Sequence, residues 1–171
     1  GLFLDGLCPT SNHPNGIAGY TYNFDDSKKY YIMCKNSERG LGDGLLFQRN
    51  TIAAWKPYFN TTTEVNDSAA WYLEFNPLNG YYSFKNAVSG KYLTRSTTTS
   101  GMSVKQTSVP STAEQFQLMP DRTNVTLGAG KNKVTTHGYW FTWYNDGNKA
   151  MSANALGKRS GYGTLEQTAF N

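Results

Sequence analysis

The sequence predicts an all-β fold made of three similar units. Aromatic or apolar residues alternate with polar ones in several short segments, which is the pattern of half-buried strands. No segment shows a convincing helical period over ten or more residues. A short aromatic strand followed by a polar turn occurs three times along the chain. One unit of this size cannot bury its own apolar face, so the three must share a core, and closure into a pseudo-threefold barrel is the economical arrangement.

Composition agrees with this class. A chain of 171 residues is within the range of one domain. Charged residues make up 16% of the chain, below the roughly 25% of an average soluble domain. Aromatic residues reach 15%, and this mixture favours strands and turns over surface helices.

The repeat is clearest in its second copy, the stretch GYYSFKNAVSGKYLTRS at residues 80–96. Its Tyr81 corresponds to Tyr31 in the first copy and to Trp140 in the third. A further strand is expected before each copy: GYTYNF at 19–24, AWYLEF at 70–75 and EQFQLM at 114–119. After the copies come WKPYF at 55–59, GMSVKQTSV at 101–109 and GYGTLEQTAF at 161–170. Pro57 would confine WKPYF to an edge or a bulge.

The two ends of the domain are expected to meet. The third unit has no closing strand after Gln167, because the chain stops at Asn171. The N-terminal strand GYTYNF is the piece that can fill this gap. We therefore predict an N-terminal arm or linker at residues 1–19 and one domain at residues 20–171.

The second unit resembles a subdomain of a known family. The runs Y-Y-S-F-K-N-A-V-S-G-K-Y-L, G-M-S-V-K-Q and E-Q-F-Q-L resemble a ricin-B-type β-trefoil, the architecture of many lectins and of family 13 carbohydrate-binding modules. The resemblance implies a β-trefoil with three pseudo-repeats of about 50–60 residues. The Q-x-W ending of the family appears here as Q-F-Q at 115–117, and in unit one as A-A-W without Gln.

The same resemblance implies shallow sugar pockets. Each would have an acidic residue after the G-K-x-L turn, an aromatic residue in the next loop, and Asn or Gln on a later strand. The acidic position reads Thr94 in unit two and Ser152 or a neighbour in unit three, whereas unit one offers Asp43. The ligand-binding candidates are Asp43, Trp55, Tyr58, Asn60, Thr94, Gln106, Tyr162 and Gln167. A simpler role is open for several of them, since Asp caps Gly-rich turns and Gln is ordinary on an exposed strand.

The aromatic residues fall into two groups according to their position in the alternation of the predicted strands. Those at alternating, in-phase positions are expected in the core: Trp71, Phe75, Phe84, Phe116, Phe141 and Trp143. Those out of phase or in loops are expected outside it: Trp55, Tyr58, Trp140, Tyr144 and Tyr162. Only the second group offers ring faces to a ligand.

Other site chemistry has little support in the sequence. Cys34 falls on an inward face, where it is either a buried free thiol or the partner of Cys8 in a disulfide. The isolated His13 and His137 show no zinc-ligand spacing, and no spacing selects a pair of carboxylates for glycoside hydrolysis. We therefore expect no metal, no cofactor and no catalytic activity.

The expected function is a noncatalytic module that binds extracellular polysaccharides or glycans. The net charge is +4 and its Lys and Arg residues are scattered along the chain, which argues against a nucleic-acid partner. No apolar stretch is long enough to insert into a membrane. The start lacks the features of a signal peptide, so an exported form would have lost its signal already. A place as an accessory module of a larger secreted glycan-active enzyme fits this expectation.

The alternative is a β-trefoil that binds proteins, of the Kunitz-type inhibitor or fascin-like kind. A Kunitz-type role would need an exposed loop such as 60–67 or 97–101 to dock into a protease. Fold alone does not decide between these functions.

Overall fold

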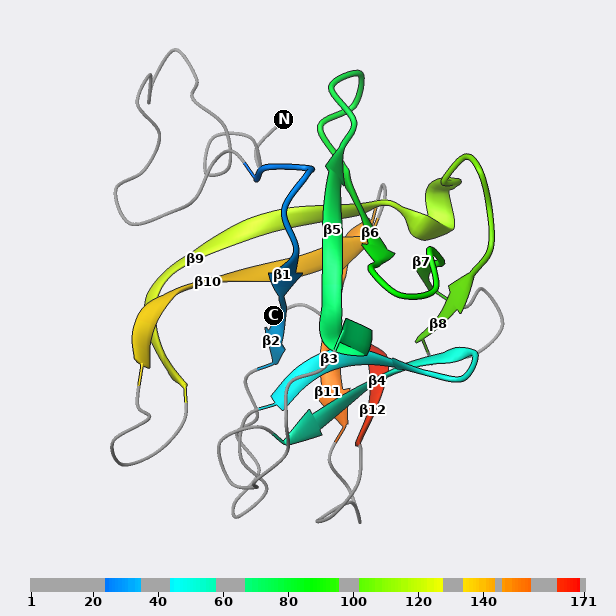
Figure 1. Ribbon diagram of the computed structural model, residues 1–171. Helices are drawn as coiled ribbons and strands as arrows, with labels where there is room; N and C mark the ends of the chain where they lie inside the picture. The colour runs from blue at the N-terminus through cyan, green and yellow to red at the C-terminus, as the bar shows by residue number, and fades with distance from the viewer. Residues whose placement is uncertain are drawn as a thin grey trace.

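The computed structural model describes residues 24–34, 44–57, 67–95, 102–127, 134–143, 146–154 and 163–169. These residues form an all-β fold with two short 3-10 turns, η1 (Asp67–Ala69) and η2 (Thr112–Glu114) (Figure 1). The described strands are β1 (Tyr30–Tyr31), β2 (Met33–Cys34), β3 (Gly44–Arg49), β4 (Ile52–Pro57), β5 (Ala70–Phe75), β6 (Tyr82–Asn86), β7 (Tyr92–Arg95), β8 (Met102–Lys105), β9 (Phe116–Leu127), β10 (Val134–Trp143), β11 (Asp146–Asn154) and β12 (Gly163–Ala169).

In units two and three, all successive strands pair as antiparallel hairpins, and in unit one the last three strands do. Unit one holds β1 to β4, unit two β5 to β8, and unit three β9 to β12. The four strands of unit two pair in chain order, and so do the four strands of unit three. In unit one, β2 pairs with β3 and β3 with β4. The internal repeat of the sequence is therefore a repeated meander of strands.

Contacts between units partly repeat along the chain. The aromatic strand of one unit pairs with the first strand of the next, because β1 pairs with β5 and β6 pairs with β9. The last strand of unit one pairs with the last strands of both other units, β8 and β12. These pairings nearly close the sheet into a barrel. The predicted β-trefoil class is confirmed.

Several predicted strands coincide with observed ones. The segment AWYLEF is β5, the second aromatic copy is β6, and the third lies within β10. The first copy is interrupted at Ile32 and forms β1 and β2. Residues 19–23 lie outside the described residues. The pairing of the N-terminal strand with unit three and the domain boundaries at 19 and 20 stay predictions.

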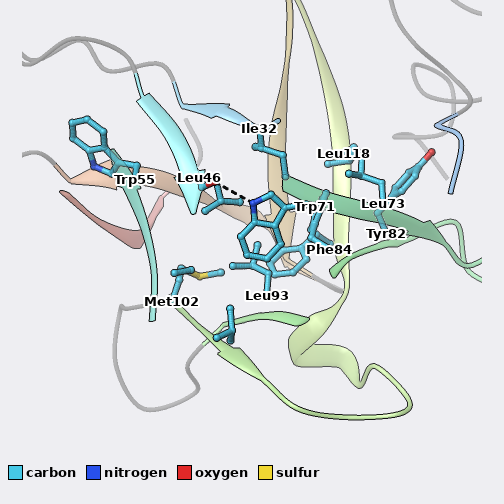
Figure 2. Packing of buried hydrophobic residues seen from close by; sticks show 13 residues of the cluster. Ile32, Leu46, Trp55, Trp71, Leu73, Tyr82, Phe84, Leu93, Met102 and Leu118 are labelled. Atoms are coloured by element: carbon cyan, nitrogen blue, oxygen red, sulfur yellow. Dashed lines mark hydrogen bonds between the residues drawn. The ribbon is translucent and has the colours of Figure 1, made fainter. Parts of the chain in front are cut away.

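The core lies between the three units. Trp71 is fully buried, and its indole Nε1 donates a hydrogen bond of 3.1 Å to the carbonyl of Leu46 in unit one. Figure 2 shows its ring beside Leu93 and Phe84. The cluster comprises Ile32, Leu46, Ala53, Trp55, Trp71, Leu73, Tyr82, Phe84, Leu93, Met102, Val104, Phe116 and Leu118. The predicted core positions of Trp71, Phe84 and Phe116 are confirmed, whereas the side chains of Phe141 and Trp143 lie outside the described residues.

Two predictions about aromatic residues are wrong. Alternation predicts Phe75 in the core, but it is 41% exposed, because β5 ends there and the chain turns away from the barrel (Figure 1). The same pattern predicts Trp55 outside the core as a ligand-binding ring, but it is 0% exposed. The reason is that β4 pairs with β3, β8 and β12 and is buried on both faces here, with Ala53, Ala54 and Trp55 all buried, so alternation marks no outward position.

Two similar turns set the register of unit two. The turns at 76–80 and 86–90 both begin with Asn and end with Gly in a left-handed conformation, with φ of 77° at Gly80 and 71° at Gly90. The side-chain oxygen of Asn76 accepts from the Leu78 N–H at 3.0 Å. Asn86 does the same for Val88 at 3.0 Å. This turn chemistry holds the strands so that alternate residues face the core.

Candidate functional site

The four strands of unit two have one apolar face and one polar face. On the core side, Leu73 lies opposite Phe84, and Leu93 opposite Val104. The residues next to them along the chain point the other way, and successive strand pairs align them across the sheet. This alignment forms a row that we call the outer row: Tyr72, Lys85, Tyr92 and Lys105.

Glu74 extends the outer row on β5. It lies two residues from Tyr72, on the same face, and makes a side-chain hydrogen bond with the Tyr92 hydroxyl. Burial raises the pKa of Tyr92, and the hydrogen bond to Glu74 and its charge raise this pKa further. The other carboxylate oxygen of Glu74, Oε1, is buried and has no hydrogen-bond partner in the part of the chain that the structure describes. Glu74 therefore retains an unused acceptor.

Lysine side chains flank the Tyr92 ring. The Lys85 ammonium group lies 5.9 Å from the ring centroid, within the range of a cation–π contact. Lys105 is opposite Tyr92 on the other neighbouring strand, and its side chain is exposed. The outer row and Glu74 thus bring together phenol rings, a carboxylate acceptor and two ammonium donors.

A second carboxylate, Glu114, is used very differently. It is 1% exposed, and its Oε1 accepts from the backbone N–H and the hydroxyl of Ser111 at 3.0 and 2.8 Å. Its Oε2 accepts from the Thr94 hydroxyl at 2.6 Å. Burial raises the pKa of Glu114, but these hydrogen bonds and the positive charge of Lys105 outweigh it, so the pKa lies below its ordinary value. Glu114 ties η2 to β7.

The structure separates the predicted site residues. Thr94 is 9% exposed, and its hydroxyl is committed to Glu114 rather than open to a ligand. In unit two, therefore, the position that the resemblance gives to an acid carries a donor, and the carboxylate comes from η2. Gln106 is exposed directly after β8, and Trp55 is in the core.

The remaining predicted residues lie wholly or partly outside the described part of the chain. Gln167 lies in β12 opposite Met151, but its side chain is outside the described residues. The same holds for the Cys34 side chain in β2. Outside the described residues altogether lie Asp43, Tyr58, Asn60, Tyr162 and Cys8.

The residues that the structure brings together in unit two were not among those predicted from the sequence. Glu114 carried a recognisable signal, because Ser111 and Glu114 have the S-x-x-E spacing of a capping box, which η2 forms. Glu74, Lys85 and Lys105 each stand next to an apolar core residue in the sequence. Their joining into one row depends on how the four strands are aligned, and alternation within a single strand carries no information on that alignment.

Metal-binding clusters and membrane-spanning helices are both absent from the described residues. This part of the chain holds no group of three or more His, Cys, Asp or Glu side chains that could bind a metal ion. Within the same residues, no helix has the length and apolar character needed to cross a membrane. The expected absence of metals and cofactors stays a prediction.

Comparisons with solved structures give the fold. A cytolethal distending toxin from Haemophilus ducreyi is similar with a TM-score of 0.59 at 14% identity, over 95% of this chain and 83% of that one. The cytolethal distending toxin from Actinobacillus actinomycetemcomitans has a TM-score of 0.58 at 13% identity, over 85% and 82% of the two chains.

A larger enzyme is also similar. A GlcNAcα1-4Gal releasing endo-β-galactosidase from Clostridium perfringens has a TM-score of 0.56 at 14% identity, over 84% of this chain but only 29% of the galactosidase chain. No family model and no curated protein matches the sequence. At these identities the likeness concerns fold alone, and with the strand pairing above it makes the chain a β-trefoil.

Proposed function

We propose that this chain is a noncatalytic carbohydrate-binding module of the ricin-B or family 13 kind. The observation that carries the proposal is the polar face of unit two, where the outer row and Glu74 combine the partly exposed ring of Tyr72, ammonium donors and a carboxylate acceptor, above the buried ring of Tyr92. Sugar recognition needs this combination, because hydroxyl groups must find partners as water leaves while C–H faces pack on aromatic rings.

Each group has a role in the proposed site. The Glu74 carboxylate, which has an oxygen without a partner among the described residues, would accept from a sugar hydroxyl after a local shift of the side chains that cover it. Tyr72 is partly exposed and would offer its ring face. Lys85 and Lys105 would donate to ring or substituent oxygens. Asp43 stays the proposed marker of a separate pocket in unit one.

The similar structures support the proposal that such a module is part of a larger protein. The Clostridium perfringens protein is named as an endo-β-galactosidase that releases GlcNAcα1-4Gal, and the similar part is a minor share of its length. By analogy, this chain would be a glycan-recognition part of a larger protein that acts outside the cell. The open face would bind a single saccharide weakly, at roughly millimolar to high-micromolar Kd, and would depend on multivalent display.

Protein binding is the second candidate. It is favoured by three aliphatic side chains in loops, Leu78, Val88 and Val109, which are 94%, 66% and 74% exposed. Loops 60–67 and 97–101, which a Kunitz-type role would use, lie almost entirely outside the described residues. A pull-down with immobilised protein ligands would favour this candidate only if soluble glycans fail to compete.

A glycan array with multivalently displayed protein tests the proposal. The wild type is compared with Glu74→Gln, with Asp43→Ala and with Asp26→Asn as a control at an exposed carboxylate. We expect saccharide signals that Glu74→Gln weakens and that Asp26→Asn leaves unchanged. Signals lost only in Asp43→Ala would move the site to unit one. No signal on any glycan would reject carbohydrate binding.

A further inference from the structure

We infer that the outer row recognises an acidic saccharide, a sugar that carries a carboxylate or sulfate group. This inference rests on the proposed function and names the substrate class of the same site. Three features of the described residues carry it. Two lysines lie on either side of one ring, neither forms an ion pair with a carboxylate, and Glu74 lies beside them.

Strand register places the two lysines for joint use. Lys85 and Lys105 lie on the two strands that flank β7, and each is opposite Tyr92. Neighbouring strands are about 4.8 Å apart, so the two backbones are separated by about 10 Å. Lysine side chains are long and flexible, which lets both ammonium groups reach one anionic substituent held above Tyr92.

Neither ammonium group forms an ion pair with a carboxylate among the described residues, although the nearby charge of Glu114 attracts Lys105. In that part of the chain, the only contact assigned to the Lys85 ammonium group is with the Tyr92 ring. Lys105 is attracted by Glu114, but both oxygens of that buried carboxylate already accept hydrogen bonds from Ser111 and Thr94. Both ammonium groups thus keep their donors for a ligand, and an anion between them would relieve their mutual repulsion.

The Glu74 carboxylate limits which kind of anionic ligand the site can bind. It lies on the same face and keeps one acceptor oxygen without a partner among the described residues. A nucleic acid, with a charge at every phosphate, would bring negative charge against this carboxylate. A sugar with one acidic group and several hydroxyls fits better, because a hydroxyl can donate to Glu74 while the acidic group faces the lysines.

The test uses pairs of probes that differ only in charge. The carboxylate pairs are polygalacturonate with its methyl-esterified form, and a sialyllactose polymer with the lactose polymer. The sulfate pair is dextran sulfate with dextran. Titrations compare the wild type, Lys85→Gln, Lys105→Gln, the double variant, and Lys28→Gln as a control at an exposed lysine outside unit two.

We expect at least one acidic probe to bind at least about tenfold more tightly than its neutral partner. Each outer-row lysine should contribute about threefold, since exposed ion pairs are individually weak. The double variant should lose about tenfold for the acidic probe and little for the neutral one, and Lys28→Gln should lose less than about twofold.

Other outcomes overturn the inference in distinguishable ways. Equal binding of acidic and neutral probes, or equal losses in Lys28→Gln and the outer-row variants, would reject acidic recognition but keep carbohydrate binding. Single-stranded DNA that binds as tightly as the best acidic probe, with the same dependence on the outer row, would show general polyanion binding instead. Failure of every acidic probe would reject the inference, whereas the proposed function falls only if the glycan array also gives no signal.

Discussion

Two carboxylates in one region of the molecule illustrate two uses of the same group. Glu114 is buried, and both of its oxygens accept hydrogen bonds from Ser111 and Thr94. Glu74 is partly exposed, hydrogen-bonds Tyr92, and leaves its Oε1 without a partner among the described residues. A carboxylate whose oxygens both have hydrogen-bond partners stabilises the fold, whereas the buried Oε1 of Glu74 can accept from a ligand once the side chains that cover it shift.

The largest expected effect is that of Glu114→Ala on stability. Truncation leaves the buried Thr94 hydroxyl without its acceptor and removes the acceptor of both Ser111 donors. We expect the free energy of unfolding to fall by about 3 kcal/mol in urea titrations. The control is Asp26→Ala, which removes an exposed carboxylate and should change this free energy by less than about 0.5 kcal/mol. Equal losses in both variants would contradict the structural role of Glu114.

Thr94→Val isolates one contact of Glu114. The substitution keeps the shape of the side chain but removes the donor that lies 2.6 Å from Oε2. We expect a loss of about 1.5 kcal/mol, the usual size for a hydrogen bond to a charged group. In Glu114→Gln, the further cost of Thr94→Val should be smaller, because the charge is already absent. Additive costs would show that the two side chains do not interact.

Acid should weaken the fold partly through Glu114. Its pKa lies below the ordinary value of 4.5, so the unfolded chain binds more protons than the folded one as the pH drops. The contribution of Glu114 is fully present above pH 4.5 and is lost as the pH falls through its folded pKa. Asp25, whose pKa is lowered chiefly by hydrogen bonds from Ser27, acts in the same direction.

Glu114→Gln should therefore flatten the dependence of unfolding free energy on pH below 4.5 without abolishing it. Denaturant titrations at several acidic pH values measure the slopes of the wild type and the variant. Identical slopes in the wild type and Glu114→Gln would assign the acid sensitivity to other groups.

The smallest expected effect on stability is that of Glu74→Gln. The amide keeps an acceptor for the Tyr92 hydroxyl and removes a charge that is incompletely satisfied among the described residues. We expect a change below about 0.5 kcal/mol in either direction, together with weaker glycan binding. A loss of about 2 kcal/mol or more would make Glu74 structural and would remove it from the proposed site.

Much of the fold follows from patterns in the sequence. Alternation predicts β5 with its bounds, and the repeated aromatic strand predicts three units that close a barrel. Alternation fails at strand ends. Phe75 keeps the phase of Trp71 but lies where β5 leaves the barrel. Alternation also fails for Trp55, because β4 is buried on both faces there, with Ala54 buried as well.

The candidate site is less predictable for a physical reason. Its members come from four strands, and only register tells which residue lies opposite which. Lys85 and Lys105 are far apart in the sequence and look scattered there. The asparagine–glycine turns are recognisable as turns, but a shift of one residue in the pairing across them would move these lysines to the opposite face.

The most direct test of the account is an NMR titration of the full chain with the best glycan from the array. Binding at the polar face of unit two predicts that the largest amide shift changes fall on Glu74, Lys85, Tyr92 and Lys105 and on their chain neighbours. It also predicts that Glu74→Gln weakens the titration. Shift changes confined to other units, or a titration unaffected by Glu74→Gln, would contradict the assignment of this face as the glycan site.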